Sequence, residues 1–144
     1  MSKSVLLCDD EVYILRAAEI KFRHAGYDVR TANDGEQAWA ALQEAKPDAL
    51  VTDCQMPRLD GLGLLQRIRE HPATADLPVL MLTGKGFELS REELAARWNV
   101  REVLSKPFSP RELVERVEEI VKSAKPRAVG GEIPPTQSGG FSNC

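Results

Sequence analysis

The sequence is poor in cysteine and aromatic residues, and it has no long apolar run. Its three cysteines (Cys8, Cys54 and Cys144) are widely spaced and form no CxxC pair, so we expect reduced thiols and neither a disulfide framework nor a zinc site. No apolar stretch approaches the roughly 20 residues of a membrane-spanning helix, and residues 1–10 lack the features of a signal peptide. These absences predict a cytoplasmic protein with no membrane partner.

A basic excess is also missing. The 19 Lys and Arg residues are outnumbered by 22 Asp and Glu residues, which gives a net charge of −3 at pH 7 and no chain-wide positive field for nucleic acid. With 42% hydrophobic and 28% charged residues in 144 positions, the composition is typical of one globular domain. Residues 125–144 are rich in Pro, Gly and Ser, so we expect a domain over residues 1–124 followed by a flexible tail.

Five short apolar segments have the length of β-strands: residues 5–8, 27–31, 49–52, 79–83 and 102–105. The first, third and fourth are nearly continuous in apolar residues, which is typical of parallel strands buried on both faces. Asp28 and Arg30 interrupt the second segment, and this favours a place at the edge of the sheet.

A segment with helical periodicity follows each predicted strand, around residues 11–24, 38–45, 61–68, 94–98 and 113–121. Candidate N-caps are Asn33 or Asp34, Ser90 and Ser109, and Asn99 suits the left-handed residue that follows a helix. Strand–helix alternation of this kind predicts an α/β fold. We expect a flavodoxin-like, doubly wound parallel sheet of five strands in the order 2-1-3-4-5.

Polar residues gather where the predicted strands end. Ligands of such sheets bind outside the carboxyl ends of the strands, at the switch point between the first and third strands. The polar residues at these ends are Asp9, Asp10 and Glu11 after the first strand, Asp53 after the third, Thr83 in the fourth and Lys106 after the fifth. We therefore expect these side chains to meet at one rim of the sheet.

Three carboxylates in one crevice require a counter-charge. Two unit charges about 4 Å apart repel by about 4 kcal/mol at an effective dielectric constant near 20. A divalent cation such as Mg²⁺ removes that repulsion and leaves coordination positions free for phosphate oxygens. Because carboxylates also act as nucleophiles toward phosphoryl groups, the set predicts phosphorylation of Asp53, assisted by Mg²⁺, Lys106 and Thr83.

The same residues carry a resemblance to a known family. Residues 53–61 read Asp-Cys-Gln-Met-Pro-Arg-Leu-Asp-Gly, and with Asp9-Asp10, Thr83-Gly84 and Lys106-Pro107-Phe108 they resemble the receiver domains of two-component response regulators. The likeness covers about residues 3–122. It implies that Asp53 accepts a phosphoryl group from the phosphohistidine of a sensor histidine kinase or a histidine phosphotransfer protein. The chain ends soon after its last predicted helix, so we expect a stand-alone, chemotaxis-regulator-like receiver without an output domain.

The resemblance also implies a role for each site residue. Asp10, Asp53 and the backbone carbonyl of Gln55 would bind Mg²⁺, with Asp9 near the metal, directly or through water. Thr83 would move toward the phosphoryl group as a switch, Lys106 would pair with that group, and the Lys106–Pro107 peptide bond would be cis. A downstream protein would dock on the face formed by the fourth helix, the fifth strand and the fifth helix, with no nucleic acid involved.

Three positions relate to switching and to the lifetime of the phosphoryl group. Many receivers carry Tyr or Phe three residues before the lysine, but this chain has Val103 there, so an aromatic switch is not expected. In the family, the residues two past the aspartate and two past the threonine tune how long the phosphoryl group lasts. These residues are Gln55 and Lys85, and they predict no particular lifetime.

Other interpretations of the sequence stay open. A pseudo-receiver would bind proteins without being phosphorylated. A phosphatase with an Asp nucleophile normally has a second Asp two residues later, where this chain has Gln55, so we expect no enzymatic turnover beyond self-phosphorylation and self-dephosphorylation. Taken singly, Asp9 and Asp10 could cap the first helix, and Lys106 could be a solvated surface lysine.

Overall fold

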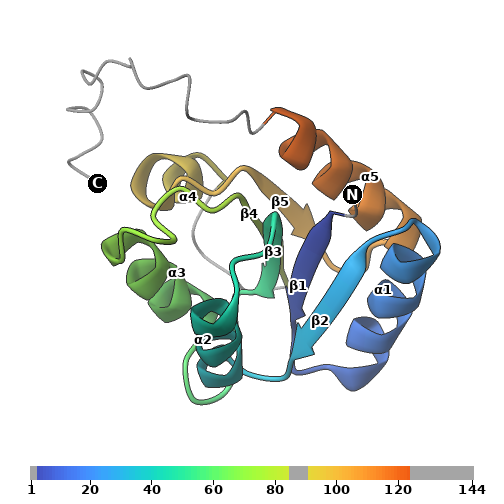
Figure 1. The fold of residues 1–144 in the computed structure, drawn as a ribbon, viewed down its shortest axis with the longest axis horizontal. Coiled ribbons are helices and arrows are strands. Elements are labelled where there is room, and N and C mark those ends of the chain that lie inside the picture. The colour runs from blue at the N-terminus through green and yellow to red at the C-terminus, as the bar shows by residue number, and fades with distance from the viewer. Residues whose placement is uncertain (1–2, 85–90, 124–144) are drawn as a thin grey trace.

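The computed structural model describes residues 3–84 and 91–123 and contains one parallel sheet of five strands. The strand order is β2-β1-β3-β4-β5, which confirms the predicted flavodoxin-like topology (Figure 1). The strands are β1 (Ser4–Cys8), β2 (Asp28–Ala32), β3 (Ala49–Asp53), β4 (Val79–Thr83) and β5 (Glu102–Ser105). Among the described residues, no helix is both long and apolar enough to cross a membrane.

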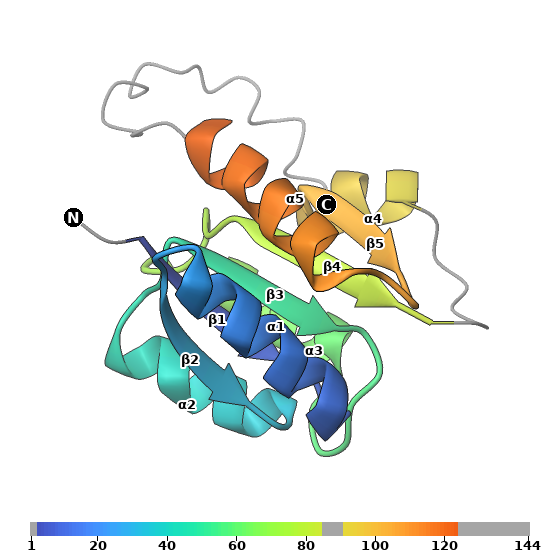
Figure 2. The same cartoon turned by 90° about the vertical axis from the view of Figure 1, so that its right-hand side faces the viewer.

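Five helices in the described part of the chain cover the two faces of the sheet. They are α1 (Val12–His24), α2 (Gly35–Glu44), α3 (Gly61–Glu70), α4 (Arg91–Trp98) and α5 (Pro110–Ser123). Side chains of α1 and α5 share one buried cluster with the sheet, and side chains of α2, α3 and α4 share the other. Helices α1 and α5 therefore lie together on one face, as Figure 2 shows, and the remaining three lie on the opposite face.

The interior strands are those that the apolar segments predict. Every residue of β3 and β4 is buried, whereas β2 and β5 at the two edges are partly exposed. The second strand begins one residue later than predicted, at Asp28. The Tyr27 amide donates to the Phe22 carbonyl at 3.1 Å and its ring packs edge-on against the Phe22 ring, so Tyr27 closes α1 before the sheet pairing starts.

Several predicted helix ends are confirmed. The Asp34 side chain accepts a hydrogen bond from the Gln37 amide at 2.8 Å, Ser109 Oγ accepts one from the Glu112 amide at 3.0 Å, and Asn99 has a φ of 57°. Asp60, which the sequence analysis does not identify, caps α3 by accepting from the Gly63 amide at 2.9 Å. Ser90, Lys85, Cys144 and the predicted tail over residues 125–144 lie outside the described residues.

The loop that follows β3 is packed tightly against the start of α3. The Gly61 amide donates to the Cys54 carbonyl at 2.9 Å. A Cβ atom on Gly61 would lie 2.5 Å from the Asp53 carbonyl oxygen and 2.7 Å from Cys54 Cα, both of which are backbone atoms. The close approach at Gly61 therefore holds α3 directly against the backbone at Asp53.

We expect Gly61→Ala to lower the free energy of unfolding by about 1–3 kcal/mol, because the backbone atoms around the new methyl group have to move apart. Urea unfolding monitored by circular dichroism measures this change. Gly63→Ala in the same helix is the matched control, since its closest contact would be Leu59 Cδ1, the end of a flexible side chain, at 2.8 Å. Equal stabilities of the two variants would contradict the proposed close packing at Gly61.

Candidate functional site

The predicted site residues meet at the carboxyl edge of the sheet. Parallel pairing sets Cys8 of β1 opposite Thr52 of β3, and Asp53 opposite Leu82 of β4. Thr83 in turn pairs with Ser105 of β5. The strands thus end at nearly the same level, and this register brings together the side chains that follow β1, β3 and β5.

Three carboxylates form the centre of the site. Asp9, Asp10 and Asp53 each offer one oxygen, and these oxygens all lie within 4.8 Å of one another. Asp9 and Asp53 are only 2% and 6% exposed, whereas Asp10 is exposed. Backbone amides orient the two buried groups: the Glu11 amide donates to Asp9 Oδ1 at 2.8 Å, and the Cys54 amide donates to Asp53 Oδ1 at 2.9 Å.

The Lys106 ammonium lies among these acidic groups. Lys106 Nζ is 3.0 Å from Asp9 Oδ2, 3.2 Å from Asp53 Oδ2 and 3.0 Å from Glu11 Oε1. Its backbone amide donates to the Thr83 carbonyl at 2.8 Å, and the Lys106–Pro107 peptide bond is cis. The sequence places Glu11 at this rim, but its pairing with Lys106 is not predicted; the consecutive acidic residues after β1 are the only signal for it.

Burial raises the pKa of both Asp9 and Asp53, and the nearby Lys106 charge only partly offsets this effect. For Lys106 burial acts to lower the pKa, but the close contacts with Asp9 and Glu11 and the charges of Asp9 and Asp53 raise it overall. The lysine therefore stays charged. One ammonium serves several carboxylates, and the site keeps an excess of negative charge.

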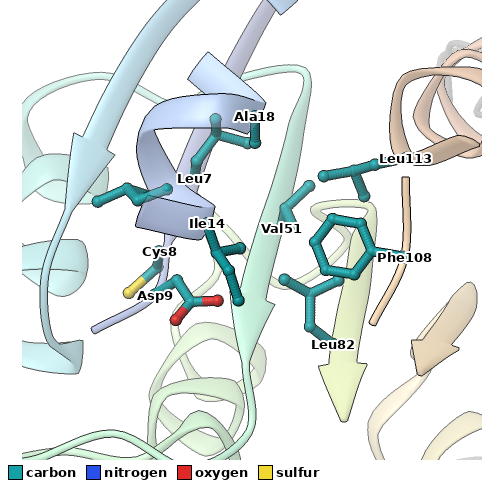
Figure 3. A pocket seen from close by; sticks show the side chains of 10 residues that line it. Leu7, Cys8, Asp9, Ile14, Ala18, Val51, Leu82, Phe108 and Leu113 are labelled. Carbon is teal, nitrogen blue, oxygen red and sulfur yellow. The ribbon is translucent and has the colours of Figure 1, made fainter. Parts of the chain in front are cut away.

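An apolar layer beneath the carboxylates accounts for the burial of Asp9. Figure 3 shows the Asp9 carboxylate at one end of a pocket whose other side chains are mainly aliphatic or aromatic. Ile14 from α1, Leu82 from β4 and Phe108 from the segment after β5 line it. Because these side chains offer no polar contacts, the charged form of Asp9 is poorly solvated on this side.

The remaining site residues surround this centre. Thr83 is the last residue of β4 and is 8% exposed. Gln55 is exposed, and its backbone amide together with that of Cys54 acts to lower the pKa of Asp53. The thiols of Cys8 and Cys54 are buried, which raises their pKa to about 12 and about 11, so both stay protonated near neutral pH and are poor nucleophiles.

Two of the simpler interpretations of single residues are wrong. The N-cap of α1 is Glu11, whose side chain makes no capping hydrogen bond, so neither Asp9 nor Asp10 occupies the cap position. The Lys106 side chain is only 15% exposed and is not a solvated surface lysine. Both observations place these residues in one connected acidic site.

The donor set fits a hard divalent cation. All three groups are carboxylates, the ligands that Mg²⁺ prefers, and neither the two histidines nor the thiols join the group among the described residues. Asp9 Oδ2 is buried, and although Lys106 Nζ lies 3.0 Å away, no well-aligned hydrogen bond from any described residue reaches this oxygen. The oxygen is therefore available to a cation or to a water molecule bound to one.

Comparisons with known proteins agree with this arrangement. The family model for the "Response regulator receiver domain" matches residues 5–118. The alkaline phosphatase synthesis transcriptional regulatory protein PhoP of Bacillus subtilis is 35% identical over 133 residues, which cover 92% of this chain and 54% of that protein. The chain thus spans about half the length of the curated relatives it matches.

Solved structures with the same fold include two receivers. The chemotaxis response regulator CheY4 of Vibrio cholerae has a TM-score of 0.76 at 30% identity, covering 83% of this chain and 99% of that one. The receiver domain of the sensor histidine kinase PA1611 from Pseudomonas aeruginosa PAO1 has a TM-score of 0.75 at 28% identity, covering 85% of this chain and 100% of that one. The latter structure holds a magnesium ion coordinated in its active site cleft.

We expect Asp53→Asn to raise the free energy of unfolding of the metal-free protein near pH 7. The pKa of Asp53 is raised in the folded state, so ionising this carboxyl costs stability. That cost is absent below the pKa of an unfolded aspartate, about 3.9, and grows as the pH rises through the folded-state value.

Urea unfolding in the presence of a chelator, at several pH values between about 4 and 7, measures this effect. The gain of Asp53→Asn over the wild type should increase with pH. Asp28→Asn, at an exposed position in β2, is the control and should show no comparable increase. A variant that is less stable than the wild type at neutral pH would contradict the predicted cost of the buried charge.

Proposed function

The chain belongs to the response regulator receiver domain family, and we propose that it accepts a phosphoryl group on Asp53 and thereby switches a protein-docking surface. The observation that carries the proposal is the convergence of Asp53 with Asp9, Asp10 and Lys106 at one edge of the sheet. If Asp53 were only a turn residue at the end of β3, there would be no reason for two further carboxylates and an ammonium to lie beside it. A phosphoryl acceptor needs a carboxylate, an acidic metal site and a fixed positive charge.

Asp10, Asp53 and the backbone carbonyl of Gln55 would hold Mg²⁺, with Asp9 beside the metal, directly or through water. The acidic trio within 4.8 Å and the buried, poorly satisfied Asp9 Oδ2 support this assignment. When bound, Mg²⁺ neutralises charge on the carboxylates and on the phosphoryl oxygens. Asp10 is the exposed member of the trio, so its side chain lies on the side open to solvent.

In the transfer step, a carboxylate oxygen of Asp53 attacks the phosphorus of a phosphohistidine. The new O–P bond forms as the P–N bond breaks, and the electron pair of that bond stays on the donor's histidine nitrogen. Lys106 Nζ, which is 3.2 Å from Asp53 Oδ2, would pair with an oxygen of the transferred group. The hydroxyl of Thr83, at the end of the adjacent strand, would turn toward another of these oxygens.

The output surface would be the face formed by α4, β5 and α5. Lys106 follows β5 directly, so a change at the phosphoryl group acts on the strand that separates the two helices. Val103 of β5 stands where many receivers have an aromatic residue, and movement of Thr83 would therefore reach this face without an aromatic side chain. To turn a population ratio of about 1:99 into 99:1, the phosphoryl group has to favour the active state by about 5.5 kcal/mol.

The proposed phosphoryl donor is a sensor histidine kinase or a histidine phosphotransfer protein. Two expectations about other partners and output stay predictions, because curated relatives of this chain are transcriptional regulators nearly twice its matched length. One is that the chain acts as a stand-alone receiver through protein docking. The other is that it contacts no nucleic acid.

Asp53→Asn should abolish phosphorylation by a small acyl phosphate, because the amide that replaces the carboxylate is not a nucleophile. Mass spectrometry of the intact protein, incubated with acetyl phosphate and Mg²⁺, measures the added phosphoryl group. Asp28→Asn is the control and should be labelled like the wild type. Labelling of the Asp53 variant at the wild-type rate would refute the site, and failure of the wild type to be labelled or to bind beryllofluoride would favour a pseudo-receiver.

Asp10→Asn should weaken Mg²⁺ binding at least about tenfold, because it removes one negative ligand from the trio. Isothermal titration calorimetry of the unphosphorylated protein measures the affinity. Asp10 is exposed, so the variant is expected to fold normally, which circular dichroism checks. An unchanged affinity would show that the metal is held elsewhere.

A further inference from the structure

Lys106 has one partner that is not a member of the acidic trio. Its ammonium lies 3.0 Å from Asp9 Oδ2, 3.2 Å from Asp53 Oδ2 and 3.0 Å from Glu11 Oε1. The trio whose oxygens lie within 4.8 Å of one another includes Asp9 and Asp53 but not Glu11. The ammonium donates hydrogen bonds to Glu11 Oε1 and Asp53 Oδ2 and forms an ion pair with Asp9 Oδ2.

We propose that Glu11 is a positioning residue, which holds the Lys106 ammonium over Asp53 in the unphosphorylated protein and has to release it to the phosphoryl group. The inference rests on the function proposed above. It assigns to Glu11 a competition for Lys106, so that the strength of this ion pair helps to set how readily the phosphorylated state forms.

The three partners differ in how easily they can leave the lysine. Asp9 and Asp53 are 2% and 6% exposed, so departure of the ammonium would leave their carboxylates poorly solvated. The Glu11 side chain is 57% exposed, and water solvates its carboxylate as soon as the ammonium departs. Glu11 is therefore the partner that the phosphoryl group displaces at the lowest free-energy cost.

The backbone of Glu11 is fixed even though its side chain is exposed. Its amide donates to Asp9 Oδ1 at 2.8 Å, and its carbonyl accepts a hydrogen bond from the Leu15 amide of α1 at 3.0 Å. Glu11 has an extended conformation, with φ −89° and ψ 101°, as the N-cap of α1. Release of Lys106 thus requires only a side-chain rotation, and the helix that begins at Val12 can stay in place.

The competition can be tested with beryllofluoride, a mimic of the phosphoryl group, titrated at saturating Mg²⁺ and followed by ¹⁹F NMR. Glu11→Gln should raise the affinity for beryllofluoride about two- to fivefold, the size expected for a partly exposed ion pair. Glu44→Gln, an exposed carboxylate at the far end of α2, makes the same change in net charge and should leave the affinity unchanged.

A second background separates positioning from direct repulsion of the anion. In Lys106→Met, the Glu11→Gln change should leave the affinity unaltered, because the lysine through which Glu11 acts is gone. A similar gain in both backgrounds would show that the Glu11 charge acts on the anion itself, and no gain in the wild-type background would show that no competition exists. Either result overturns the proposal.

The anchoring pair can also be measured without any ligand. A double-mutant cycle of Glu11→Gln and Lys106→Met, followed by urea unfolding of the metal-free protein, should give non-additive changes in stability. Additive changes would show that the two side chains do not interact, and this would overturn the proposal. If the wild type failed to bind beryllofluoride, the proposed function would fall, while the unfolding cycle would still decide whether Glu11 anchors Lys106.

Discussion

The whole site depends on one half-buried ammonium, that of Lys106, which faces more carboxylates than it can neutralise. Lys106 lies within 3.2 Å of oxygens from Asp9, Glu11 and Asp53, and yet burial still raises the pKa of both aspartates. Such a cluster is costly to the folded state in the absence of a metal. The same three carboxylates, whose oxygens lie within 4.8 Å of one another, are the donors that a hard divalent cation prefers. A cation bound at these carboxylates would therefore also remove the electrostatic cost that they impose on the folded state.

The fold maintains this imbalance because it leaves the charged side chains few alternatives. The parallel register ends β1, β3 and β4 at one level, and two apolar clusters hold the sheet between its helices. Gly61 lets the start of α3 lie directly against the backbone of Asp53. The aliphatic and aromatic side chains below Asp9 close the site on the side of the core (Figure 3). Solvent is left with access mainly through the exposed Asp10 and Glu11.

The sequence predicts most of the fold because its strongest signals are local. Continuous apolar segments identify the buried strands, and Asp34, Asn99 and Ser109 mark helix ends through the backbone groups that their side chains or conformations satisfy. The predicted start of β2 is wrong by one residue because the Tyr27 amide still donates to the Phe22 carbonyl and closes α1, a local helix-end bond that apolar patterning does not show. At the site, strand ends predict which residues converge, but they do not predict the direction of each side chain. The Glu11–Lys106 pair joins residues 95 positions apart in the sequence, so no local pattern could reveal it.

Position 103 is valine and not an aromatic residue, so the polar contacts of α4 with β5 become the candidate route by which the proposed switch would reach the α4–β5–α5 face. Arg91, the first residue of that helix, donates to the Val103 carbonyl at 3.1 Å and pairs with Glu102 of β5 at 3.5 Å. Glu102 also pairs with Arg116 of α5, so one carboxylate links α4, β5 and α5. The Arg91 side chain is 59% exposed, and ion pairs of this kind contribute only about 0.2–1 kcal/mol. A shift of α4 against β5, as the proposed switch would require, would therefore break only a weak polar contact.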